Sequence, residues 1–275
     1  MKKLTHADVM SLLAPIEAVR KILLEELRQC DSMPNDMIYD SLESQLLTLK
    51  GVELITVDLS NVDLSQLFLR RANLTGSILR YADLSKTNLS AAILRKTDLE
   101  GACLAKASMR GADLSGANFT LANLTDCSLA DSIVGQAIFL NANLTRASMN
   151  GLNLAGANLT GACLRDCNLE RANLSKAKLE KVNATGVVCQ NAKLSRSRLS
   201  GACLANSYFE RAVLNRAHMV GADLSGANFC QADLTFADLT NANLNNANLE
   251  NARLIGAKLN GVAIEAADTT GVKWQ

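Results

Sequence analysis

Residues 222–249 read ADLSGANFCQADLTFADLTNANLNNANL, a string in which a large apolar residue returns at every fifth position. The same spacing extends in both directions over residues 52–264, where the positions ending in 4 or 9 are the apolar centres. There are 43 such centres without an insertion or deletion, and Leu fills 32 of them. Only Ala184 and Cys189 are small, and Ala fills 27 of the 43 positions two residues before a centre. The run is therefore a single uninterrupted repeat array.

A period of five fits neither an α-helix, whose face recurs about every 3.6 residues, nor a β-strand, whose face recurs about every 2. A register held over this length is typical of a solenoid, in which each turn of chain packs only on its neighbours. Both prolines, Pro15 and Pro34, precede the run, so every residue keeps the backbone N–H that a coil-to-coil ladder needs. Of 16 glycines, 15 stand at positions ending in 1 or 6, where we expect corners with positive φ.

The repeat Ala-(Asn/Asp)-Leu-(Ser/Thr)-X, seen as ANLTG at residues 157–161, resembles that of the pentapeptide-repeat family over about four fifths of the chain. The resemblance implies an all-β solenoid, a right-handed quadrilateral parallel β-helix with four pentapeptides in each coil. In that fold the centre and the small residue two before it point inward. The run then predicts about eleven coils, and a spacing of about 4.8 Å per coil gives a rod on the order of 50 Å long.

Residues 1–50 lie outside the repeat and carry two apolar stripes at helical spacing. The stripes are Ile16, Val19, Leu23 and Leu27, and then Ile38, Leu42, Leu46 and Leu49. They predict a small α-helical segment, which is either a cap over the first coil or an interaction module, because an uncovered coil end promotes aggregation. Residues 51–275 are the predicted β-helix, with Trp274 expected to plug its far end.

The composition argues against several classes of protein. The net charge is +1, so no strongly charged partner is expected for the chain as a whole. No stretch has 18 consecutive apolar residues, and no cleavage site follows the start of the chain, so we expect neither a membrane span nor a signal peptide.

Cysteine spacing predicts free thiols. In the expected register Cys103, Cys163 and Cys203 share an outward column, whereas Cys127 and Cys167 share an inward one. Members two coils apart are about 10 Å apart, too far for a disulfide. Free thiols favour a cytoplasmic location. No Cys-x-x-Cys pair occurs, so no metal site is expected.

Catalytic signatures are missing from the sequence. The two histidines, His6 and His218, lie in separate regions, and no nucleophile, base and acid converge in the expected fold. No Gly-rich phosphate loop occurs. We therefore expect a protein that is not an enzyme and has no cofactor.

The most regular charge pattern is cationic. Six side chains recur in pairs at a spacing of 20 residues, which predicts a double ladder along one side: Lys176, Lys178, Arg196, Arg198, Arg216 and His218. Such a ladder suits an anionic partner, although a merely solvated face has the same composition. Because no aromatic residues are interleaved with the ladder, single-stranded nucleic acid is not the expected ligand.

A second candidate contact is apolar. Leu121, Ile138 and Leu140 are expected to point outward on neighbouring coils, with Ile133 on the preceding side. An outward apolar cluster on a polar rod indicates a contact site.

These features predict a non-enzymatic protein-interaction scaffold or regulator whose partner is another protein. Some relatives in the family resemble DNA and bind DNA gyrase, so a gyrase-directed DNA mimic is the first alternative, and an anion binder is the second. The outward acids Asp58, Asp98 and Asp238 form no continuous stripe, which a duplex mimic needs. A homodimer formed through residues 1–50 or a coil end stays open.

Overall fold

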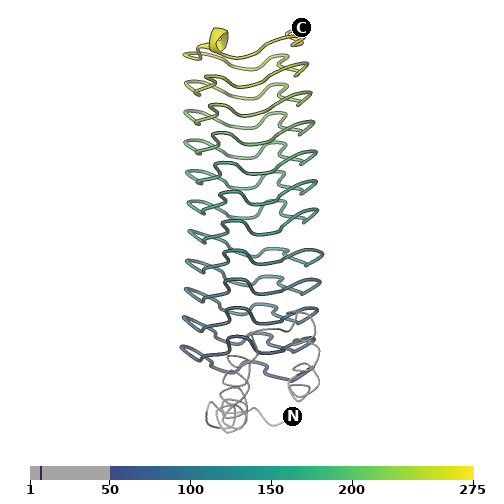
Figure 1. The fold of residues 1–275 in the computed structure, drawn as a ribbon, viewed down its shortest axis with the longest axis vertical. Coiled ribbons are helices and arrows are strands. Elements are labelled where there is room, and N and C mark those ends of the chain that lie inside the picture. The colour runs from purple at the N-terminus through teal and green to yellow at the C-terminus, as the bar shows by residue number, and fades with distance from the viewer. Residues whose placement is uncertain (1–6, 8–49) are drawn as a thin grey trace, which may run out of the picture.

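A computed structural model describes residue 7 and residues 50–275 of the chain. In it the repeat forms a long straight rod of stacked coils, with early coils at one end and the C-terminus at the other (Figure 1). The predicted helical cap falls almost entirely on residues 1–6 and 8–49, outside the described residues.

Each coil contains 20 residues and four corners. Parallel bridges join residues 20 apart at nearly every position of this kind along the rod, as in Asn118 to Ile138 and Ile138 to Asn158. Every residue of the described chain with positive φ stands at a position ending in 1 or 6, as the glycine positions predicted. At nearly every described corner the centre carbonyl accepts the N–H three residues on, for example Leu89 O from Ala92 N at 3.0 Å. Positive φ at the third residue of such a turn is typical of type II turns.

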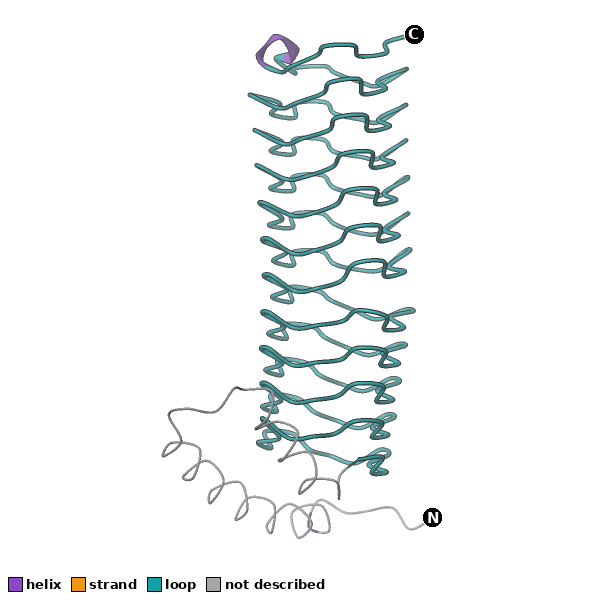
Figure 2. Cartoon of the chain, turned by 45° about the vertical axis from the view of Figure 1, so that its right-hand side comes forward, coloured by secondary structure: helices purple, strands orange, loops and turns teal. Residues whose placement is uncertain are grey.

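Extended strands are absent from the described residues, and Figure 2 shows the rod as loop. The sequence predicted an all-β solenoid, but a corner after every fifth residue leaves each straight segment too short for an extended strand. Only the residue before each centre forms a bridge, such as Asp98 between Ile78 and Asn118. The described part contains one short 3₁₀ helix, η2 (Ile264–Ala266), near the C-terminal end.

The polar residues of the repeat motif stabilise the corners of each coil. The Asn or Asp before each centre accepts a hydrogen bond from the N–H two residues on, as Asn118 Oδ1 does from Thr120 N at 3.1 Å. When a Ser or Thr follows the centre, its hydroxyl donates to the same oxygen, here at 2.6 Å. Short polar side chains of this kind stabilise turns. The Asn/Asp-Leu-Ser/Thr order therefore fixes the backbone between successive corners.

The core is a pair of inward columns on each side of the rod. The centres and the residues two before them are buried from Leu54 to Leu254. Phe119 and Phe139 stack as predicted, with ring centroids 5.1 Å apart. Trp274, the expected plug, is 45% exposed. It stands at an inward position of the repeat register in the last described coil.

One interior break interrupts the coil-to-coil ladder. Between residues 131–137 and 150–158, the backbone hydrogen bonds found at equivalent positions on other coils are missing. The bridge expected between Ile133 and Asn153 is missing too. Leu152 takes an inward position where Ala is commonest and is 3% exposed. We attribute the break to its added volume, which holds the two coils apart on this side.

Candidate contact face

One side of the rod is built by the pentapeptides at residues 57–61, 77–81 and every 20 residues thereafter, and we call it the contact face. Its outward column runs through successive bridges from Asp58 at one end to Lys258 at the other. Both sets of contact residues predicted from the sequence touch this face. The geometry of the contact face therefore decides whether the two sets of residues can contact one partner.

The six predicted cationic residues lie together on the contact face and its corner, and we call them the cationic ladder. Lys178, Arg198 and His218 are consecutive members of the outward column. Lys176, Arg196 and Arg216 occupy the adjacent corner and have positive φ. All six side chains are exposed. The ladder therefore spans three successive coils, as the spacing of 20 predicted.

Most of this positive charge is not neutralised. Arg198 pairs with Glu180, with Nε 2.6 Å from Oε1. The guanidinium of Arg216 lies over the Phe236 ring, 5.6 Å from its centroid. Within the described chain Lys176, Lys178 and Arg196 make no ion pair. The exposed Lys181 stands at the opposite corner of the same face, so the region stays strongly cationic.

Leu121, Ile138 and Leu140 form the apolar cluster of the contact face. Leu121 is 56% exposed and Ile138 is 40% exposed, whereas Leu140 is half-buried. Leu121 N donates to Leu140 O at 3.0 Å, which joins the two coils at this point. Ile133 is exposed on the preceding side, as expected.

The apolar cluster and the cationic ladder share one column, a relation that the sequence analysis missed. Ile138 is bridged to Asn158, and Asn158 is bridged to Lys178. A single coil, with Asn158, Thr160 and Gly161 facing outward, separates the two sets. The signal was present in the numbering, since 138 and 178 differ by two full coils.

Carboxylates on the contact face are engaged by neighbouring cations or hydroxyls. Asp98 pairs with Arg80 at 2.6 Å, and Asp238 pairs with Lys258 at 3.2 Å. The Thr240 hydroxyl, a hydrogen bond from its backbone N–H and the Lys258 ammonium lower the pKa of Asp238. Within this column Asp58 and Asp98 are separated by Ile78. The face therefore presents no run of adjacent carboxylates.

The potential metal ligands and the thiols of the described rod are dispersed along it. No group of three or more His, Cys, Asp or Glu side chains that converges on a metal position occurs among the described residues. The seven described cysteines are free thiols. Burial raises the pKa of Cys127 to about 12 and also raises that of Cys167 and Cys189. A raised pKa keeps a thiol protonated and unreactive.

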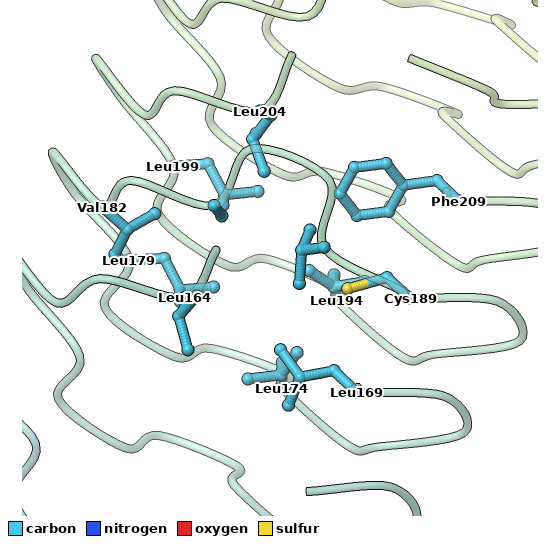
Figure 3. Close-up of a pocket in the computed structure, with 12 residues that line it drawn as sticks. Leu164, Leu169, Leu174, Leu179, Val182, Cys189, Leu194, Leu199, Leu204 and Phe209 are labelled. Atoms are coloured by element: carbon cyan, nitrogen blue, oxygen red, sulfur yellow. The ribbon is translucent and has the colours of Figure 1, made fainter. Parts of the chain in front are cut away.

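An apolar cavity lies in the core beside the cationic ladder (Figure 3). Its wall includes Ala184 and Cys189, the two small centres. Other lining residues, including Leu164, Leu194 and Phe209, are apolar as well. Because no polar side chain points into it, the cavity is a packing defect and not a ligand site.

The family assignment rests on the repeat itself. A model of pentapeptide repeats matches eight copies, which together span residues 53–268. The chain belongs to the pentapeptide-repeat family. Membership makes the solenoid a right-handed β-helix. No helix in the described part of the chain is long and apolar enough to cross a membrane.

Several solved structures of pentapeptide-repeat proteins are similar to this chain. HetL, from the cyanobacterium Nostoc sp. strain PCC 7120, is involved in heterocyst differentiation regulation; it is 28% identical, with 88% of this chain and 97% of HetL covered and a TM-score of 0.32. A protein from the Arabidopsis thaliana thylakoid lumen is 36% identical, with 38% and 70% covered and a TM-score of 0.34. QnrB1, a plasmid-mediated fluoroquinolone resistance protein, is 20% identical, with 82% and 92% covered and a TM-score of 0.32. Among curated proteins, none matches this chain. Beyond the family assignment, these similarities say nothing about the function of this chain.

Proposed function

We propose that this pentapeptide-repeat protein is a non-enzymatic scaffold or regulator that presents its contact face to another protein. One observation carries the proposal: the apolar cluster and the cationic ladder lie on the same side of the rod, separated by one coil. Exposed apolar side chains beside unneutralised cations are typical of a protein-binding surface. A rigid β-helix holds such residues at fixed spacing without the cost of ordering a loop.

Two features support a binding role over catalysis. Where a hydroxyl of the contact face meets a carboxylate, as Ser60 does Asp58 and Thr240 does Asp238, the pair is the turn hydrogen bond that recurs along the rod. The cavity nearest the cationic ladder is apolar and lined by core residues. We therefore propose that the chain acts through contact alone.

A gyrase-directed DNA mimic is the less favoured candidate. A duplex mimic needs a dense run of carboxylates, whereas Asp98 and Asp238 on the contact face are each paired with a cation. If the mimic interpretation is right, the purified protein inhibits gyrase supercoiling at micromolar concentration. Neutralising Asp58, Asp98 and Asp238 would then abolish the inhibition.

Affinity capture from a nuclease-treated native extract tests the proposal. We expect the wild-type chain to retain at least one protein, and a variant with serine at positions 196, 198 and 216 to retain less of it. A matched control replaces three exposed corner lysines with serine: Lys86, Lys96 and Lys106. Failure of the wild-type chain to retain any protein after nuclease treatment would contradict the proposed function.

A further inference from the structure

We infer that the contact face binds an acidic polypeptide segment that carries large apolar residues at one end and lies along the rod axis. This inference rests on the proposed function and names the chemistry of the partner. It starts from the order of the surface along one column: apolar at Ile138, neutral at Asn158, and cationic from Lys178 to His218. A partner that follows this column meets the three regions in that order.

The length of the surface fits a short segment. Coils stack at about 4.8 Å, so Ile138 lies about 10 Å from Lys178 and about 20 Å from His218 along the axis. An extended chain covers about 20 Å with roughly six residues, and a helix covers it with roughly thirteen. Either form places apolar residues and carboxylates on one partner at the required separation.

The charges select an acidic partner. Glu180 is the one carboxylate that pairs with a ladder cation in the described chain, and Arg198 is the one ladder cation that it pairs with. Lys176 and Arg196 project from neighbouring coils of the same corner, about 5 Å apart. Carboxylates that reach these side chains relieve the repulsion between them and make the complex sensitive to salt.

The apolar cluster selects a polypeptide over a nucleic acid. Leu121 and Ile138 are more than a third exposed, and both are aliphatic, so they offer no platform on which a base stacks. A leucine or phenylalanine of a peptide gains free energy by covering them. A polyanion such as duplex DNA would use the cationic ladder and leave the apolar cluster in water.

A selection from a displayed library of random 15-residue peptides on the immobilised full chain tests the inference. We expect the enriched peptides to carry apolar residues followed by Asp or Glu. The affinity of a labelled enriched peptide is then measured by fluorescence anisotropy for each variant at low and high salt. Circular dichroism checks that every variant keeps the fold.

Two variants and two matched controls separate the halves of the surface. The apolar variant is Leu121→Asn with Ile138→Ser, where Asn suits the positive φ at residue 121. The charge variant combines Arg196→Ser, Arg198→Ser and Arg216→Ser. Ile78→Ser is the apolar control, because Ile78 lies in the same column and is also 40% exposed. The charge control combines Lys86→Ser, Lys96→Ser and Lys106→Ser.

We expect each half variant to raise the peptide Kd about tenfold or more, as loss of a central anchor does. We expect the controls to change the Kd by less than about twofold. The inference is wrong if the enriched peptides show no acidic bias or bind equally well to the apolar variant. It is also wrong if heparin and duplex DNA bind as tightly as the peptide and depend on the ladder alone.

The outcome is distinguishable from failure of the proposed function. If a protein is captured from the extract and neither half variant weakens its retention, the scaffold role stands and the acidic-segment inference falls. If neither a protein nor a peptide binds the wild-type chain, both fall.

Discussion

Arg216 lies over the ring of Phe236, with its guanidinium carbon 5.6 Å from the ring centroid. Both residues occupy the same corner column, one coil apart, and both have positive φ. The next residue in the column is Gly256, directly beside the Phe236 ring. A cation–π contact of this kind contributes about 0.5–1 kcal/mol at an exposed site. The column of cations at this corner therefore ends on an aromatic ring that fixes the last arginine.

Gly256→Ala tests how closely the ring packs. A Cβ at residue 256 would lie 2.5 Å from Phe236 Cδ1, and φ there is +66°. Gly221→Ala is the control, because φ is +64° and no atom lies within 4 Å of its Cβ position. We expect the control to lose about 1–2 kcal/mol from the left-handed backbone alone, and Gly256→Ala to lose more in urea unfolding.

Removing the ring completes this test. In the double variant Phe236→Ser with Gly256→Ala, the stability lost by Phe236→Ser alone is subtracted first. The remaining loss of unfolding free energy should then equal that of Gly221→Ala. Equal losses for Gly256→Ala and Gly221→Ala would show that the ring moves aside without cost.

The apolar cavity predicts a stabilising change. Ala184 and Cys189 stand where Leu is usual, and both line the cavity. Ala184→Leu should raise the free energy of unfolding by about 0.5–2 kcal/mol by filling it. Ala162→Leu is the control at a closely packed inward position, 0% exposed, and should destabilise the fold by about 1–3 kcal/mol. Destabilisation by Ala184→Leu as large as that of the control would show that the cavity cannot accept the side chain.

Register explains what the sequence predicted well. A strict period of five determined which residues are inward, which occupy corners, and which stack 20 apart. The stacking of Phe209 on Phe229, with centroids 5.0 Å apart, follows from numbering alone. The cationic ladder and the apolar cluster were placed outward for the same reason, and their common column needed only a comparison of residue numbers.

Side-chain packing explains what the sequence did not predict. The pairing of Arg198 with Glu180 depends on how two long side chains orient across neighbouring coils. The exposure of Trp274 depends on how the indole packs on the coil before it, and the period does not determine that packing. The break beside Leu152 depends on volume inside the rod, and a period of five carries no information about coil separation.

Amide exchange should reveal the break in the ladder. In the described chain, Val134 N and Gln136 N make none of the backbone hydrogen bonds that their equivalents one coil earlier make. Those equivalents, Leu114 and Gly116, donate to Ile133 O and Gly135 O at 2.7 and 2.8 Å. Because open amides exchange faster, we expect faster hydrogen exchange at residues 131–137 than at residues 111–117, measured by NMR.

The variant Leu152→Ala checks the cause that we assign to the break. If the volume of Leu152 separates the coils, the smaller side chain should allow the missing bonds to form and slow exchange at Val134 and Gln136. Unchanged exchange in a folded Leu152→Ala protein would contradict that cause. Slow exchange of both amides in the wild-type chain would contradict the break itself.

Thiol labelling should divide the cysteines by burial. Cys203 is exposed, whereas Cys127, Cys167 and Cys189 are buried. Since the thiolate is the reactive form and burial raises these three pKa values, we expect a thiol reagent at pH 8 to modify Cys203 quickly. The buried three should react only after unfolding. Labelling of Cys167 in the native state as fast as that of Cys203 would contradict the register of this column.

The same burial predicts a loss of stability at alkaline pH. The folded-state pKa of Cys127 is about 12, whereas a cysteine of the unfolded chain ionises near about 8.5. A raised pKa in the folded state contributes stability that is fully present below the unfolded pKa and is lost as the pH rises towards the folded one. We therefore expect the urea midpoint to fall between pH 8.5 and pH 12. In the variant Cys127→Ala with Cys167→Ala, which places Ala at two inward positions where it is commonest, the fall should be smaller. An equal fall in both proteins would assign the alkaline loss to other groups, such as lysines and tyrosines.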